Sequence, residues 1–291
     1  MSIINAKEIM MVSAKEKYAV GAFNITDLVQ MEAVVEAAVA KKAPLIIQTS
    51  VKPTKFLGVN VLVAIYRTIA EQAPIPICLH LDHCTEIEHC KKCADAGYTN
   101  IMIDASKQPY EENIRQTKEI VEYCHKVGNI SVEGELGTVS GVEDQIKVSE
   151  DETQLANPRQ AVEFVERTGL DIFAPAIGTA HGVYKTKNPK VDFERLGNIN
   201  EMLNGRKIVT PLVVHGGTGL PEDYIKKLIE MGGAKVNVST ELKRTMLDAQ
   251  FEYISAHREE YDPGKVDEAV KVAIRNAVSH WIDILGCAGK A

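Results

Sequence analysis

Short apolar runs alternate with longer amphipathic segments along the whole chain. Eight runs lack the polar alternation of a half-exposed strand, as expected of parallel strands that are covered on both faces. They lie at Tyr18–Asn24, Pro44–Ser50, Ile75–Asp82, Asn100–Ala105, Ile130–Leu136, Asp171–Ile177, Pro211–His215 and Ala234–Val238. Eight strands that alternate with helices predict a (β/α)8 TIM barrel of the α/β class. A doubly wound open sheet is the structural alternative.

The segments between these runs place apolar residues three and four positions apart, which predicts helices. The predicted helices are Leu28–Ala40, Phe56–Ala73, Ile87–Ala96, Glu111–Val127, Pro158–Arg167, Phe193–Leu203, Pro221–Met231, Glu241–Ala256 and Val266–Leu285, of which the last two are additional C-terminal helices. No break in composition divides the chain, so we expect residues 1–291 to form a single barrel domain.

One connection between predicted elements is unusually long. Gly137–Asn157 is polar and follows the fifth predicted strand. Loops of this length without secondary structure are uncommon in compact domains and often act as lids over active sites. We therefore expect Gly137–Asn157 to act as a lid, and a solvated acidic loop is the alternative.

Composition restricts the possible functions. The 291 residues are 45% hydrophobic and 25% charged, with a net charge of -7, which argues against nucleic-acid and membrane partners. The N-terminus lacks the features of a signal peptide, and no apolar stretch approaches the roughly 20 residues that span a bilayer. We therefore expect a cytoplasmic protein.

The six scattered cysteines do not indicate a disulfide framework. Cys90 and Cys93, with Cys84, could form a thiolate metal site, but buried reduced thiols are the simpler interpretation.

Three histidines, His83, His181 and His215, stand at or just beyond the ends of three predicted strands. The carboxyl ends of barrel strands share one rim, and three imidazoles with an open fourth position are typical of catalytic zinc. His80 precedes them within its strand, and we interpret it as structural. His89, His125, His257 and His280 fall on predicted helices, and we expect them at the surface.

Other polar residues are predicted at the same rim. They are Asn24, Ser50, Asp82, Asp104, Glu135, Asn237 and Ser239. Two glycine clusters, Gly178–Gly182 and Gly216–Gly219, accompany two of the histidines, and Lys185 follows closely. Glycine lets backbone N–H groups approach an anion, and the loops after the seventh and eighth strands commonly bind phosphate.

Taken together, these motifs resemble the class II, zinc-dependent ketose-bisphosphate aldolases, which include fructose- and tagatose-bisphosphate aldolases. The resemblance rests on Gly21-Ala-Phe-Asn24, Leu79-His-Leu-Asp-His83, Val132-Glu-Gly-Glu-Leu-Gly137, Ile177-Gly-Thr-Ala-His-Gly182, Val191-Asp-Phe-Glu-Arg195, His215-Gly-Gly-Thr-Gly219, Lys235-Val-Asn-Val-Ser-Thr240 and Gly286-Cys-Ala-Gly-Lys290. It implies zinc-dependent, reversible cleavage of a phosphorylated ketose to dihydroxyacetone phosphate and an aldehyde, by a homodimer or homotetramer that binds a small anionic sugar phosphate.

The resemblance also implies individual roles. His83, His181 and His215 would hold zinc, with Asp104 and Glu135 at a second position for a divalent or monovalent cation. Asp82 would act as acid/base on the C4 hydroxyl, and Glu143 would exchange a proton with the dihydroxyacetone phosphate carbon. The expected substrate-binding residues are Asn24, Ser50, Lys52, Gly182, Lys185, Gly216, Gly217, Thr218, Asn237, Ser239, Thr240 and Arg275. Since neighbouring strand residues point to opposite faces, we predict that the chain turns at Asp82-His83.

The chain departs from the family pattern at three places. Cys84 replaces the usual glycine after the Asp-His pair, Lys52 adds a cation near the expected far end of the substrate, and Arg275 is the one arginine of the last predicted helix. We therefore hypothesise that the aldehyde half carries either the phosphate of glyceraldehyde 3-phosphate or another anionic group, such as the sulfonate of sulfolactaldehyde.

Other functions fit parts of the pattern. A Schiff-base aldolase needs a lysine that points into the barrel, and no predicted strand offers one convincingly; Lys235 merely opens the eighth strand. A metal-dependent barrel hydrolase usually begins with His-x-His at the first strand, where this chain has Phe23-Asn24. A non-catalytic protein that binds metal or sugar phosphate is the remaining alternative.

Overall fold

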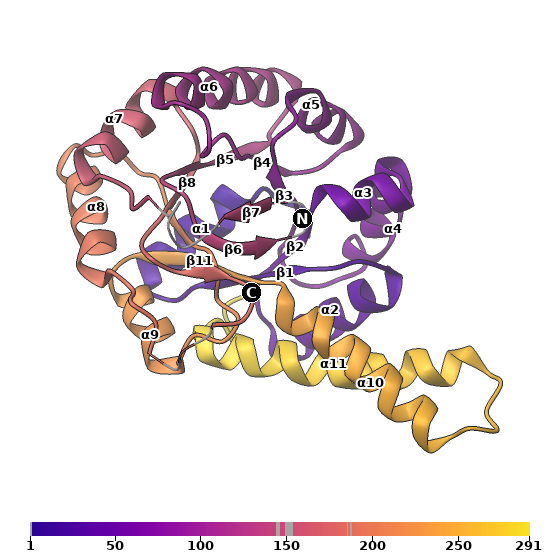
Figure 1. Cartoon of the computed structure of the whole chain (residues 1–291). Helices are drawn as coiled ribbons and strands as arrows, with labels where there is room; N and C mark the ends of the chain where they lie inside the picture. The colour runs from indigo at the N-terminus through magenta and orange to yellow at the C-terminus, as the bar shows by residue number, and fades with distance from the viewer. Residues whose placement is uncertain (1, 144–145, 149–153, 185, 187) are drawn as a thin grey trace.

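The computed structural model describes residues 2–143, 146–148, 154–184, 186 and 188–291, with only the backbone described at 142–143 and 146–148. Eight parallel strands close into a barrel (Figure 1). In order around the barrel they are β1 (Val20–Asn24), β2 (Leu45–Thr49), β3 (Ile77–Cys84), β4 (Asn100–Ile103), β5 (Ser131–Leu136), β8 (Ile172–Pro175), β10 (Leu212–Val214) and β11 (Gly233–Val238). The predicted TIM barrel is confirmed.

Helices surround the barrel and cover the apolar outer faces of the strands (Figure 1). They are α2 (Leu28–Lys41), α3 (Val51–Leu57), α4 (Val59–Ala70), α5 (Ile87–Ala96), α6 (Tyr110–Val127), α7 (Pro158–Thr168), α8 (Phe193–Gly205), α9 (Glu222–Glu230), α10 (Thr240–Ala256) and α11 (Pro263–Leu285). The last two pack against each other as an antiparallel pair and extend away from the barrel as an arm (Figure 1).

Two features of the helices differ from prediction. The helix predicted at Phe56–Ala73 is two helices, α3 and α4, because Gly58 between them has a φ of +91° that no helix continues. The N-terminal helix α1 (Ala6–Glu16) was not predicted. Asn5 accepts a hydrogen bond from the Glu8 backbone and donates one to the Glu8 side chain, a capping arrangement that the sequence did contain.

The long connection after β5 has secondary structure in the part that the structure describes. Strands β6 (Ser140–Glu143) and β7 (Ile146–Val148) are antiparallel, and β6 runs parallel to the short strand β9 (Ala180–His181). In Figure 1 the β6–β7 hairpin projects over the centre of the ring of strands. The connection is therefore attached to the segment that carries His181. Among the described residues, no helix is long and apolar enough to span a membrane.

Candidate functional site

The pair Asp82-His83 lies in a bulge near the end of β3. The register with β4 shifts between Leu81 and Cys84, and His83 has a φ of +43°. The predicted turn at this pair is thus a bulge within the strand, which continues to Cys84. Because a bulge re-aims side chains, both Asp82 and His83 are buried on the same side of the sheet, where they contact residues of the barrel interior.

The three predicted zinc ligands converge. The ring centroids of His83 and His181 are 4.8 Å apart, and those of His83 and His215 are 4.6 Å apart. One nitrogen from each ring lies within 4.8 Å of the other two, so the three rings form a group that could hold one ion. His83, Asp104 and Glu135 form a second such group. The two groups share His83, so the two candidate cation positions are adjacent.

The donor set fits a zinc ion. Asp104 Oδ2 lies 2.8 Å from His83 Nδ1, and Glu133 Oε1 lies 3.1 Å from His215 Nε2, so carboxylates orient two of the rings from behind. His215 Nδ1 and Glu135 Oε2 are 3.0 Å apart, yet both are buried and make no hydrogen bond to the described residues. Buried polar atoms are normally satisfied, and a bound cation would satisfy these two.

The surroundings of the three histidines shift their pKa values in different directions. Burial opposes protonation of His83, but the nearby carboxylates of Asp82 and Asp104 raise its pKa well above the usual value. The pKa of His215 is also raised, because Glu133 and Glu135 outweigh its burial and the nearby His83. Burial lowers the pKa of His181 well below its usual value, and the neighbouring imidazoles act in the same direction.

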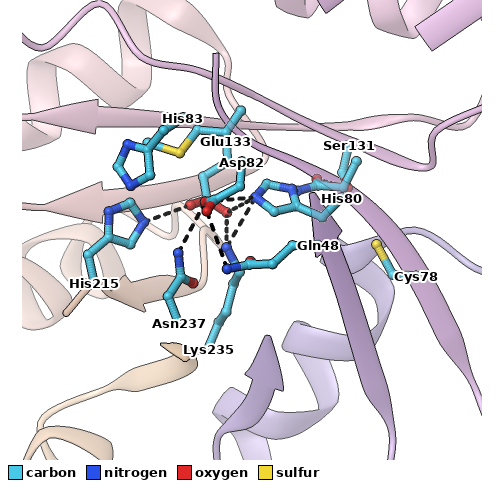
Figure 2. Close-up of polar contacts among 12 residues, drawn as sticks. Gln48, Cys78, His80, Asp82, His83, Ser131, Glu133, His215, Lys235 and Asn237 are labelled. Atoms are coloured by element: carbon cyan, nitrogen blue, oxygen red, sulfur yellow. Dashed lines mark hydrogen bonds and ion pairs between the residues drawn. The ribbon is translucent and has the colours of Figure 1, made fainter. Parts of the chain in front are cut away.

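Asp82 is the centre of a polar network inside the barrel, shown in Figure 2. Asn24 donates to its Oδ2 at 2.9 Å, and Asn237 donates to its Oδ1 at 3.2 Å. Burial would raise the pKa of Asp82, but the nearby His83, His80 and Lys235 hold it well below its usual value. Asp82 is therefore an ionised carboxylate beside the candidate metal ligands.

Three members of this network were not identified from the sequence as site residues. Gln48 donates to Asp82 Oδ2 at 3.4 Å. Lys235 donates to Glu133 at 2.8 Å, and since β11 and β5 are not neighbours, this ion pair crosses the barrel interior. The sequence signal that could have identified these three residues is their polarity within otherwise apolar strand runs.

The expectation that no strand lysine points convincingly into the barrel was wrong, because Lys235 is completely buried there. Its ammonium group is paired with the Glu133 carboxylate and lies 3.4 Å from His80 Nε2. The structural role predicted for His80 agrees with its burial and with its contact to Asn100.

A small pocket adjoins the histidines. It is lined by His181, Gly182, Gly216, Gly217, Thr218, Asn237, Ser239 and Thr240. A Cβ atom on Gly216 would lie 2.3 Å from the Ala180 carbonyl oxygen, and one on Gly217 would lie 2.6 Å from Val236, so these turns require glycine. The buried Ser239 hydroxyl neither caps α10 nor hydrogen bonds to the described residues. Backbone N–H groups at the start of a helix such as α10 are of the kind that bind an anion.

Other predicted substrate residues lie outside this cluster. Ser50 is buried at the start of α3, whereas Lys52 on the same helix is exposed. Arg275 forms an ion pair with Glu36 between α11 and α2. Glu143 ends β6, where its backbone alone is described, and Lys185 lies outside the described residues.

The remaining histidine and cysteine predictions have mixed outcomes. His89 is buried and hydrogen bonds to Thr54 across α5 and α3, so its predicted surface location was wrong. His125, His257 and His280 are exposed or partly exposed. All six cysteines are buried and free, and none belongs to a candidate metal group among the described residues.

Comparison with known proteins agrees with the fold and identifies the family. A sequence model of the family described as class II fructose-bisphosphate aldolase matches residues 4–290. The chain is 36% identical to a fructose-bisphosphate aldolase from Helicobacter pylori, over 99% of each sequence. A crystal structure assigned as a Coccidioides immitis fructose-1,6-bisphosphate aldolase has a TM-score of 0.88 and 31% identity, covering 98% of this chain and 97% of that one. The YdjI aldolase of Escherichia coli K12 has a TM-score of 0.83 and 29% identity, with 99% of each chain covered.

Replacement of His215 tests the metal site directly. His215→Ala removes one of three imidazoles, so we expect zinc affinity to fall by about tenfold or more, measured by competition with a chromogenic chelator. His257→Ala, an exposed histidine at the end of α10, is the matched control and should bind zinc normally. Undiminished zinc binding by His215→Ala would exclude this residue as a ligand.

Proposed function

Because this chain belongs to the class II fructose-bisphosphate aldolase family, we propose that it cleaves a phosphorylated ketose, with the help of zinc, to dihydroxyacetone phosphate and an anionic aldehyde. The chain is a class II aldolase, a carbon–carbon lyase. The observation that carries the proposal is the convergence of His83, His181 and His215 beside the buried carboxylate of Asp82.

Each of the site residues has a separate role in the proposed reaction. A zinc ion held by the three imidazoles would serve as a Lewis acid toward the substrate carbonyl. Asp82 accepts the C4 hydroxyl proton as the carbon–carbon bond breaks and returns it in the reverse direction. Asn24 and Asn237 hold that carboxylate in place through their amide N–H groups. Asp104 and Glu135 provide the second cation position beside the first.

The other proton transfer in this proposal belongs to a residue of the predicted lid, Gly137–Asn157. Glu143 exchanges a proton with the dihydroxyacetone phosphate carbon. Its strand β6 pairs with β9, with Gly141 opposite His181, which supports the proposed location next to the metal site. Closure of such a segment excludes water from the reacting atoms.

The two ends of the substrate are recognised differently in this proposal. The dihydroxyacetone phosphate end enters the glycine-lined pocket, with Lys185 as a further cation. The aldehyde end faces Ser50 and the exposed Lys52 on α3. Since Arg275 is paired with Glu36, its availability for a distal anion depends on release of that ion pair. Either a phosphate or a sulfonate satisfies a lysine at this end.

The arm supports the proposed homo-oligomer. On α10, Leu247, Phe251 and Ile254 follow the helical repeat, with 63%, 73% and 48% of each residue exposed. An exposed apolar stripe of this kind marks an association surface. We propose that it packs against a second copy of the chain in a homodimer, which can pair further into a tetramer.

A substrate panel tests the proposed reaction. We expect cleavage of fructose 1,6-bisphosphate, tagatose 1,6-bisphosphate or 6-deoxy-6-sulfofructose 1-phosphate, with loss of activity after chelation and recovery with zinc. Preference for the sulfonated substrate would establish the altered anion site, whereas efficient turnover of fructose bisphosphate alone would reject it. Full activity of rigorously demetallated protein would contradict the zinc mechanism.

The variant Asp82→Ala separates proton transfer from metal binding. We expect it to retain zinc, since Asp82 is outside the histidine triad, while kcat falls by about two to four powers of ten. Zinc titration and steady-state kinetics of the same preparation give both values. An unchanged kcat would remove Asp82 from the mechanism.

A charged residue placed in the apolar stripe of α10 tests whether the arm forms the proposed interface. Phe251→Asp should shift the chain toward monomer in sedimentation equilibrium, because a buried unpaired charge disrupts an interface. Val209→Asp, at another exposed apolar position before β10, is the control and should not change the assembly. An unaltered oligomer with Phe251→Asp would place the interface elsewhere.

A further inference from the structure

Two of the candidate metal ligands lie just outside the paired strands of the barrel. His181 ends the short strand β9, which follows β8, and His215 directly follows β10. The ladder between β8 and β10 pairs Phe173 with Leu212, and no other described pair of that ladder lies nearer to either histidine. That ladder alone therefore does not fix the distance between the two imidazoles.

The two loops nevertheless touch at one point. A Cβ on Gly216, the residue after His215, would lie 2.3 Å from the carbonyl oxygen of Ala180, the residue before His181. Gly216 also has a φ of +70°, a conformation that favours glycine. The backbones of the two segments are therefore in close contact at the residues next to His181 and His215.

The Tyr184 hydroxyl bridges this contact. It accepts a hydrogen bond from the Ala180 N–H at 2.9 Å and donates one to the Gly216 carbonyl at 2.8 Å. The ring lies beside Gly219, whose Cβ position is 3.5 Å from Tyr184 Cδ2. Burial raises the pKa of Tyr184 to about 12, so the hydroxyl keeps the proton that it donates. Tyr184 belongs to no part of the site assigned above.

We propose that Tyr184 is a positioning residue that sets the separation of His181 and His215, and so the affinity of the site for its metal. The proposal rests on the proposed function only in taking zinc as the ion. A single hydroxyl satisfies one backbone group from each loop, so movement of either ligand away from the other breaks a hydrogen bond.

The same hydroxyl also connects the lid to the metal site. Strand β9 pairs with β6 on one side and is held by Tyr184 against Gly216 on the other. A Cβ on Gly141 of β6 would lie 2.2 Å from the His181 carbonyl oxygen, so these strands are also in close contact. The strand that carries His181 therefore lies between β6 and the contact that Tyr184 makes with Gly216.

The variant Tyr184→Phe removes the hydroxyl and keeps the ring. Loss of such an outer contact typically costs about tenfold to a hundredfold in metal affinity, and we expect that loss for zinc in chelator competition. The control is Tyr110→Phe, because the Tyr110 hydroxyl likewise donates to a backbone carbonyl, that of Gln160, at an exposed position away from the site. A purely structural role would lower the melting temperature of the metal-free protein without changing zinc affinity. Zinc affinity equal to that of the wild type would overturn the proposal.

Hydrogen exchange at the Ala180 amide gives a second measurement on the metal-free wild type. We expect this N–H to be protected, as its hydrogen bond to Tyr184 requires, and rapid exchange would overturn the proposal even if Tyr184→Phe did not fold. Neither measurement needs a substrate. Absence of lyase activity in a wild type whose zinc affinity depends on Tyr184 would refute the proposed reaction and leave this inference intact.

Discussion

Burial of negative charge around Asp82 is the constraint on which the rest of this barrel depends. Asp82, Asp104, Glu133 and Glu135 are all buried, and Lys235 is the one lysine or arginine among the buried residues that the structure describes. Carboxylates in a protein interior cost several kcal/mol each unless they are paired. Four carboxylates and one ammonium group leave a deficit of three positive charges. Protons on His83 and His215, whose pKa values are raised, reduce that deficit in the metal-free chain.

A divalent cation reduces the same deficit in another way. Metal ligation requires neutral imidazoles, so binding releases the protons that the carboxylates had favoured. The carboxylates also orient the rings, since Asp104 contacts Nδ1 of His83, and Glu133 and Glu135 contact the two ring nitrogens of His215. One arrangement of charge therefore explains why these histidines are both unusually basic and suited to a cation.

Much of this site was predictable because parallel barrel strands end at one rim. That His83, His181, His215, Asp104 and Glu135 gather at one rim is expected from strand order, once the apolar runs are identified. The interior network was harder to predict. Glu133 and Lys235 lie on strands that are far apart in sequence and not adjacent in the sheet, so no local pattern relates them.

Local conformation was the second source of error. A turn was predicted at Asp82-His83, but its form as a bulge within β3 depends on a positive φ at a non-glycine residue, which side-chain periodicity does not predict. His89 was expected at the surface because it falls on a predicted helix, yet α3 supplies Thr54 as a buried partner. In each case packing between elements decided the outcome.

The contrast between the two ends of the site explains why the substrate's identity is the hardest property to derive. The end beside the candidate metal ligands is built from buried side chains and from glycines that close backbone contacts require, so the fold constrains its chemistry. The opposite end, as proposed, relies on Lys52, an exposed lysine on a short helix. An ammonium group is a compact point charge with rotatable donors, which recognises negative charge without imposing the geometry of phosphate. A barrel of this kind can therefore keep one reaction while its aldehyde partner changes, because the residues that discriminate are those that the core does not constrain.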